Sequence, residues 1–217
     1  MYHYVEDKVF LKRMRSFCSD LINQLVQQIN NDKVMIVESH LVGSGAKNLE
    51  TQNANKPIDL DYNIRVISAS KIDINNARAV KEYIRKQFNI ILNQNNLFDC
   101  NDSKAVLTTK KDNFTDGNKT QFSIDLAIVR TRNGNWERLI HKKTGIVAND
   151  TYCWEIAPKS KGLGDKIAKI KNHNLWNEVR DTYLEKKNMY LKRQDYNHPS
   201  FNVYIETINE IYSNHFK

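Results

Sequence analysis

Residues 58–66, IDLDYNIRV, constrain the fold more than any other segment, because they combine a strict alternation with two carboxylates. Every second residue is apolar, namely Ile58, Leu60, Tyr62, Ile64 and Val66. A period of two is typical of a β-strand with one buried face, so Asp59 and Asp61 project together from the other face. Two carboxylates placed in this way repel each other unless a positive charge lies between them. The segment therefore predicts a strand that presents a metal-binding site.

A glycine turn precedes this strand. Residues 34–43, VMIVESHLVG, are rich in β-branched side chains and predict a short strand that runs into the turn Gly43-Ser44-Gly45. Before that strand, apolar residues recur at helical spacing over residues 9–29, which predicts an amphipathic helix. The polar residues 46–57 predict a loop or a frayed half-helix.

A second helix and two further strands are predicted downstream. Asp73 fits the cap of a helix that runs to about Asn93. Residues 104–110 and 121–129 have the composition of strands. The step Asn133-Gly134 predicts a tight hairpin that leads into another strand.

The character of the chain changes after residue 157. Three segments between residues 158 and 217 have helical periodicity. We therefore predict an α/β (α+β) fold, with a mixed sheet and flanking helices in residues 1–157 and a helical C-terminal lobe in residues 158–217.

Composition fits a folded globular chain and gives a first indication of its partners. With 217 residues, of which 40% are hydrophobic and 27% charged, the chain can bury a core without disulfides. The formal net charge of +8 favours polyanionic partners such as nucleic acid or a phosphorylated small molecule. Surface lysines that only serve solubility would give the same charge, so both interpretations remain open.

The cysteines and the N-terminus indicate a cellular setting. Cys18, Cys100 and Cys153 are widely separated and lack a C-x-x-C spacing, which argues against a disulfide framework and against a thiolate zinc site. The N-terminal residues mix charged with apolar side chains, unlike a signal peptide, and no apolar run reaches membrane-spanning length. We expect a soluble, cytoplasmic protein without a membrane partner.

A third carboxylate lies on a later strand. In residues 121–129, QFSIDLAIV, Asp125 and Ser123 point away from the apolar side chains. Three aspartates on two strands, next to a glycine turn, could hold two divalent cations that activate a hydroxyl and stabilise a leaving pyrophosphate. Ligands that are all oxygen atoms favour Mg²⁺ or Mn²⁺ over zinc.

This ordered set of residues resembles the polymerase-β-like nucleotidyltransferases. The pattern of that superfamily is G-S, then D-x-D on a strand, then a third acid on a later strand; here it reads Gly43-Ser44, Asp59-Leu60-Asp61 and Asp125. The resemblance covers roughly residues 34–130 and implies a nucleotidyltransferase core. It implies that Gly43 and Ser44 bind the triphosphate, and that Asp59, Asp61 and Asp125 are the catalytic metal ligands.

A weaker similarity lies near the C-terminus. Residues 198–208, HPSFNVYIETI, are similar to the S-Y-x-x-x-x-E segment of the oligoadenylate-synthase and cyclic-dinucleotide-synthase branch, with phenylalanine in place of tyrosine. The similarity implies that Ser200 contacts the triphosphate and that the ring of Phe201 stacks on the base. The residues His198-Pro199-Ser200 also fit the start of a helix, so this alternative stays open.

The same similarity implies a basic phosphate contact on the preceding helix. Arg180, Lys186 and Lys187 are the candidates. Lys159 and Lys161 fit a solvated face, although they also lie where a phosphate-binding cleft could open.

Together, these features predict a metal-dependent nucleotidyltransferase. The expected reaction transfers a nucleoside monophosphate, with AMP from ATP as the favoured case, to an acceptor hydroxyl and releases pyrophosphate. The acceptor could be a small molecule, a second nucleotide, an RNA end or a protein side chain. The alternative is a non-catalytic, basic nucleic-acid-binding protein on the same fold. The sequence does not fix the base preference or the oligomeric state.

Overall fold

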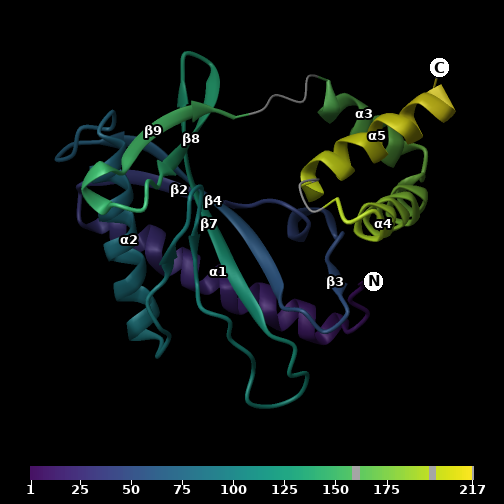
Figure 1. Cartoon of the computed structure of the whole chain (residues 1–217), viewed down its shortest axis with the longest axis horizontal. Helices are drawn as coiled ribbons and strands as arrows, with labels where there is room; N and C mark the ends of the chain where they lie inside the picture. Colours follow the sequence, from purple (N-terminus) through teal and green to yellow (C-terminus); the bar gives the residue numbers. More distant parts are fainter. Residues whose placement is uncertain (158–161, 196–198, 217) are drawn as a thin grey trace. The chain divides into compact units, whose positions relative to one another are not determined.

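A computed structural model describes residues 1–157, 162–195 and 199–216 (Figure 1). The chain forms two compact units. One, the sheet unit, comprises Asp7–Asn48 and Pro57–Ala157. The other, the helical unit, comprises Met1–Glu6, Leu49–Lys56 and Pro158–Lys217.

The sheet unit is built on a mixed sheet, as the sequence predicts. Among the described residues, seven strands form this sheet, in the order β2-β4-β7-β6-β5, with β8 paired to β7 and β9 paired to β8. Their bounds are β2 Met35–Leu41, β4 Ile58–Ala69, β5 Asn101–Asp102, β6 Leu107–Thr108, β7 Phe122–Arg132, β8 Asn135–Lys142 and β9 Thr151–Ile156. Strands β4 and β7 are parallel, whereas the other neighbouring strands are antiparallel. The predicted mixed α+β class is confirmed.

Helices α1 (Lys8–Asn31) and α2 (Ala77–Gln94) belong to the same unit (Figure 1). Helix α1 lies against the apolar face of β4 and β7, since Phe10 and Phe17 pack edge-on against Phe122 and the Ser19 hydroxyl is 2.9 Å from that of Tyr62. The alternation in β4 buries its apolar residues on this face. The opposite face of the two strands therefore presents the polar side chains.

Several predicted elements differ in extent from the observed ones. The helix predicted from Asp73 begins at Ala77, because Asn76 supplies the cap by accepting a hydrogen bond from the Ala79 N–H at 3.1 Å. The Asp73 carboxylate instead accepts from the Asn75 N–H at 2.9 Å, and this local turn competes with the helix.

Two other predicted segments differ in part from the observed structure. The strand predicted over residues 104–110 shortens to Leu107–Thr108. The predicted loop 46–57 contains a 3-10 turn, η1 (Gly45–Lys47), and strand β3 (Thr51–Asn53). Strand β3 pairs with β1 (Tyr2–Tyr4), whose existence the sequence did not indicate.

The helical unit has its own core. It contains α3 (Leu163–Asn172), α4 (Trp176–Lys192), α5 (Ser200–Phe216) and the β1–β3 ribbon. The buried core residues are Leu49, Ile170, Val179, Tyr183, Val203, Tyr204, Ile208 and Ile211. The ribbon is fastened to α4, since Asn188 Oδ1 accepts from the Tyr2 N–H at 2.7 Å and Lys187 donates to the Thr51 hydroxyl at 2.8 Å. The functional division at residue 157 stays a prediction.

No helix within the described ranges is long and apolar enough to span a bilayer.

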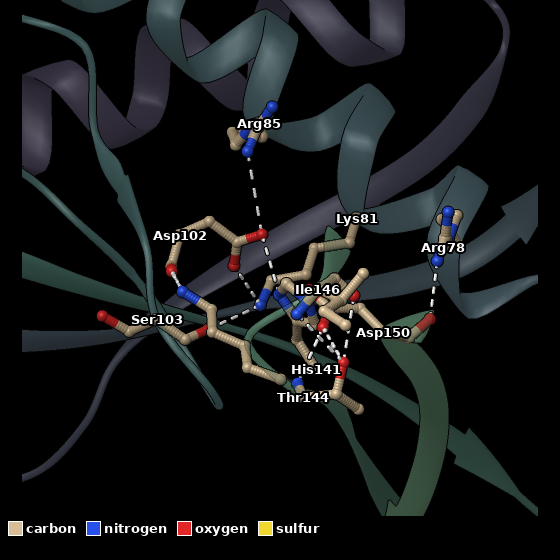
Figure 2. Close-up of polar contacts among 10 residues, drawn as sticks. Arg78, Lys81, Arg85, Asp102, Ser103, His141, Thr144, Ile146 and Asp150 are labelled. Carbon is tan, nitrogen blue, oxygen red and sulfur yellow. Dashed lines mark hydrogen bonds and ion pairs between the residues drawn. The ribbon is translucent and has the colours of Figure 1, made fainter. Parts of the chain in front are cut away.

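A buried polar network joins α2, β5 and β8 in the sheet unit (Figure 2). The Lys81 ammonium lies 2.6 Å from Oδ1 of Asp102 and donates to the Ser103 carbonyl at 2.7 Å. The His141 ring lies between two carboxylates, with Nδ1 at 3.0 Å from Asp102 and Nε2 at 2.8 Å from Asp150. The network ties β5 to α2 and β8, and thereby supports β6, the partner strand of β5.

Lys81→Met tests how strongly this network depends on burial. The Lys81 side chain is 2% exposed, so its removal leaves Asp102 buried with less compensating charge, and we expect a loss of about 3 kcal/mol in the free energy of unfolding. Arg85→Met is the matched control, because Arg85 contacts the same carboxylate at 3.7 Å but is 45% exposed; its loss should stay below about 1 kcal/mol. Urea denaturation measures both values. Equal losses would contradict the argument.

Candidate active site

The parallel register of β4 and β7 brings the three predicted aspartates onto one face of the sheet. Asp61 is the direct neighbour of Asp125, and Asp59 is the direct neighbour of Ser123. Neighbouring positions on paired strands project to the same side, so the three carboxylates lie on the face that α1 does not cover. The geometry that the sequence predicts for these residues is therefore present, whereas their catalytic role stays a prediction.

Two hydroxyl groups hold two of the carboxylates. The Ser123 hydroxyl donates a short hydrogen bond to Asp59. The Thr108 hydroxyl donates to Oδ1 of Asp125 at 2.6 Å. Sequence reasoning missed Thr108, because the two-residue strand β6 that positions it opposite Asp125 leaves no periodic pattern.

The predicted glycine turn lies directly beside Asp61. Gly43 has a φ of 63°, and a Cβ atom added to it would lie 2.1 Å from Oδ2 of Asp61. Only glycine leaves room for the carboxylate at this position. The Lys47 ammonium donates to the Gly43 carbonyl at 2.7 Å, which places a cation near the turn. Ser44 is the next residue, and its side chain forms no cap hydrogen bond with η1.

Burial and mutual repulsion shift the titration of the carboxylates. Burial is the main factor that raises the pKa of Asp61 to about 6, with further contributions from Asp125 and Asp59. Burial also raises the pKa of Asp125, against the opposing effect of the Thr108 hydrogen bond. A positive charge placed among the three groups would remove this repulsion.

Sequence reasoning also missed Arg138, which lies on β8 on the same face of the sheet. Burial lowers the pKa of its guanidinium, and the negative charges of Asp61 and Asp125 oppose this change. The hairpin predicted at Asn133-Gly134 contained the signal for this residue. Its register pairs Arg138 with Val129, and Val129 lies on the same face of the sheet as Asp125.

The residues fit a divalent cation in chemistry but do not form a finished site. Carboxylate and hydroxyl oxygens are suitable ligands for Mg²⁺ or Mn²⁺. Among the described residues, however, no group of three or more His, Cys, Asp or Glu side chains is already arranged to hold a metal ion. Asp59 and Asp125 are instead engaged with Ser123 and Thr108. These two hydrogen bonds orient the carboxylates of Asp59 and Asp125 and each involve only the Oδ1 atom.

A pocket of about 1010 Å³ opens beside Asp59 and Ser123. Its other lining residues are Asn93, Phe98, Asp99, Asn101, Thr108, Thr109, Lys110 and Lys111. Phe98 is 78% exposed, so the pocket combines an accessible aromatic ring with two ammonium groups next to the carboxylates.

The predicted C-terminal contacts belong to the helical unit. Within it, Lys186 pairs with Glu210 at 2.7 Å, and the Lys187 ammonium lies 4.0 Å from the centre of the Tyr2 ring. Ser200 begins α5, and Phe201 is 44% exposed. Their contact with a nucleotide stays a prediction, as it does for Arg180. Lys159, Lys161 and His198 lie outside the described residues.

Comparison with known proteins identifies relatives of this chain at the level of the fold alone. No family model matches the chain, and no curated protein is similar to it. Solved structures do share its fold. CdnC of Escherichia coli MS115-1, solved with ATP, has a TM-score of 0.60 and 15% identity over 97% of this chain and 62% of CdnC. The structure of CdnC in complex with HORMA-deltaN has a TM-score of 0.56 and 16% sequence identity. This match covers 94% of this chain and 60% of that CdnC chain.

A third structure is the cyclic dinucleotide synthase CdnE of Elizabethkingia meningoseptica, solved with GTP and Apcpp. Its TM-score is 0.51 at 11% identity, over 88% of this chain and 68% of CdnE. These similarities confirm the predicted resemblance to the cyclic-dinucleotide-synthase branch at the level of the fold. The chain spans about three fifths of the length of CdnC.

Gly43→Ala tests the contact between the turn and Asp61. Gly134→Ala is the matched control, because Gly134 has a φ of 72° but no atom within 4 Å of an added Cβ. Both variants strain a left-handed residue, whereas only Gly43→Ala also displaces the Asp61 carboxylate. We expect Gly43→Ala to cost about 1–3 kcal/mol more than the control, as measured by urea denaturation. Similar losses would show that Asp61 adapts freely.

Asp61→Asn tests, through pH, the cost of ionising a buried carboxylate that lies beside two others. The pKa of Asp61 is higher in the folded than in the unfolded state, so ionisation costs stability as pH rises through about 6. In EDTA at pH 8, Asp61→Asn should therefore be more stable than the wild type by about 1–3 kcal/mol, and this gain should vanish below about pH 4.

Urea denaturation across this pH range measures the effect. Asp99→Asn, at an exposed position, controls for the general loss of a negative charge. A gain that does not depend on pH, or that the control reproduces, would contradict the assignment to Asp61.

Proposed function

We propose that this chain is a metal-dependent nucleotidyltransferase. It transfers a nucleoside monophosphate, with AMP from ATP as the favoured case, to an acceptor hydroxyl and releases pyrophosphate. The observation that most directly supports this proposal is the registered pair Asp61 and Asp125, joined by Asp59 and placed beside the Gly43 turn. Such a cluster of carboxylates suits phosphoryl chemistry, where charge neutralisation and positioning supply most of the acceleration.

Each residue at the site has a distinct role in this proposal. Asp59, Asp61 and Asp125 hold the Mg²⁺ or Mn²⁺ ions, which neutralise the charge of the phosphates when bound. Gly43 and Ser44 orient the triphosphate through the amides of the turn and the serine hydroxyl. Thr108 orients Asp125 through its hydrogen bond. In the helical unit, Lys186, Lys187, Ser200 and Phe201 are proposed nucleotide contacts.

The acceptor is left as a class. The pocket beside Asp59 supports the approach of an acceptor from that side, with Lys110, Lys111 and Phe98 available for an anionic or aromatic group. A small molecule, a nucleotide or an RNA end would meet these chemical requirements. The expected cytoplasmic setting stays a prediction.

The alternative is a non-catalytic nucleic-acid-binding protein on the same fold. The net charge of +8 favours it. Nucleic-acid binding through phosphate contacts would weaken steeply with salt and would not need the aspartates.

Thermal unfolding with ATP and Mg²⁺ separates the two functions. At an ATP concentration of about 100 times the Kd, we expect the wild-type Tm to rise by roughly 5–10 °C, since a ligand that binds only the folded state stabilises it. Asp59→Asn should lose this rise because it weakens the metal site.

Glu38→Gln is the matched control. Glu38 lies on β2, is 37% exposed and pairs with Arg65, so removing its charge should leave the response to ATP unchanged. An unchanged wild-type Tm, together with salt-sensitive binding of an RNA oligonucleotide, would instead support the binding protein.

A further inference from the structure

Arg138 differs from the other arginines on the central strands of the sheet unit. Its Nε atom is buried and has no hydrogen-bond partner among the described residues. In contrast, Arg130 on β7 pairs with Glu137 at 2.6 Å and donates to the Ile74 carbonyl at 3.0 Å. The Nε atom of Arg65 on β4 is also buried without a hydrogen-bond partner, but the Nη1 atom of Arg65 pairs with Glu38 at 2.8 Å. A buried donor without a partner costs stability, so the unpaired Nε atom of Arg138 calls for an explanation.

The neighbouring carboxylate on the sheet does not satisfy Arg138. Glu155 on β9 is the register partner of Arg138 on β8. However, the Glu155 carboxylate forms an ion pair with Lys142 at 2.8 Å. The charges that act on the Arg138 guanidinium are instead those of Asp61 and Asp125. Within the described parts of the chain, no hydrogen bond or ion pair joins Arg138 to these carboxylates.

The charge arrangement indicates what such a guanidinium could bind. Arginine presents a planar fork of donors that matches the oxygens of a phosphate group. A group bound near Asp61 and Asp125 would also come near Arg138. A metal ion alone would be repelled by the guanidinium, whereas an anionic phosphate would be attracted to it.

We propose that Arg138 binds a phosphate group of the nucleotide held at Asp59, Asp61 and Asp125. This inference rests on the proposed function. It adds that Arg138 makes the site prefer a metal ion bound together with a phosphate group over a metal ion alone. Arg138 then acts in opposite directions on two ligands. It weakens the binding of Mg²⁺ alone and strengthens the binding of Mg²⁺ with ATP.

Calorimetric titration of the wild type and Arg138→Gln tests these two opposite effects on affinity. With Mg²⁺ and a non-hydrolysable α,β-methylene analogue of ATP, the variant should bind about 10- to 100-fold more weakly, because charge-assisted hydrogen bonds are lost. With Mg²⁺ alone it should bind several-fold more tightly. Adenosine, which lacks phosphates, should bind both proteins equally. A fold defect would weaken binding of all three ligands and would thereby overturn the proposal.

Two further variants sharpen the test. Arg138→Lys keeps the charge but loses the planar fork, so its affinity for Mg²⁺ and the analogue should lie between those of wild type and Arg138→Gln. Arg65→Gln is the matched control, because Arg65 lies on the same face of the sheet but already pairs with Glu38. Its affinities should equal those of the wild type.

The outcomes separate the two proposals. If wild type binds the analogue with Mg²⁺ and Arg138→Gln binds it equally well, the role of Arg138 is wrong and the proposed function stands. If wild type binds neither Mg²⁺ nor the analogue, the proposed function fails, and the role of Arg138 fails with it.

Discussion

The placement of Asp61 directly beside Asp125 is the constraint on which the rest of the site depends. Their pairing in parallel strands fixes both backbones, so only rotation of the side chains can separate the two carboxylates. The surroundings respond in two ways: the Thr108 hydroxyl holds Asp125, and the Gly43 turn leaves room for Asp61. A sheet maintains such unfavourable proximity only because its other face is stabilised by burial against α1.

The same strands therefore perform two tasks on their two faces. Alternation places Leu60 and Ile64 in the core and leaves Asp59 and Asp61 on the opposite side. Residues that stabilise the core and residues of the candidate site therefore alternate along the chain. This alternation explains why a polar site can lie on central strands. The His141 network adds a second anchor for β5 and β8 (Figure 2).

The sequence predicted those parts of the fold that local periodicity determines. The alternation over residues 58–66 and 121–129 was sufficient to place Asp59, Asp61 and Asp125 on one face, because β4 and β7 are long and regular. Strand β6 has only two residues, so its pairing depends on β7 and not on its own pattern. Arg138 was missed for a related reason, because its importance arises from the charges across the sheet. The proposed nucleotide contacts of the helical unit rest on a short sequence similarity, which local periodicity does not test.

The charge at the site also bears on the choice between the two functions. Lys47 and Arg138 lie near the carboxylates, and Lys110 and Lys111 line the adjoining pocket. At the carboxylates themselves, the phosphates of RNA would still be repelled without a metal ion. A nucleotide that arrives with Mg²⁺ meets no such barrier, since the metal ion offsets the charge of the aspartates and Arg138 remains available to the phosphate. The local charge thus favours a ligand that combines metal with phosphate, which neither the fold nor the net charge alone would indicate.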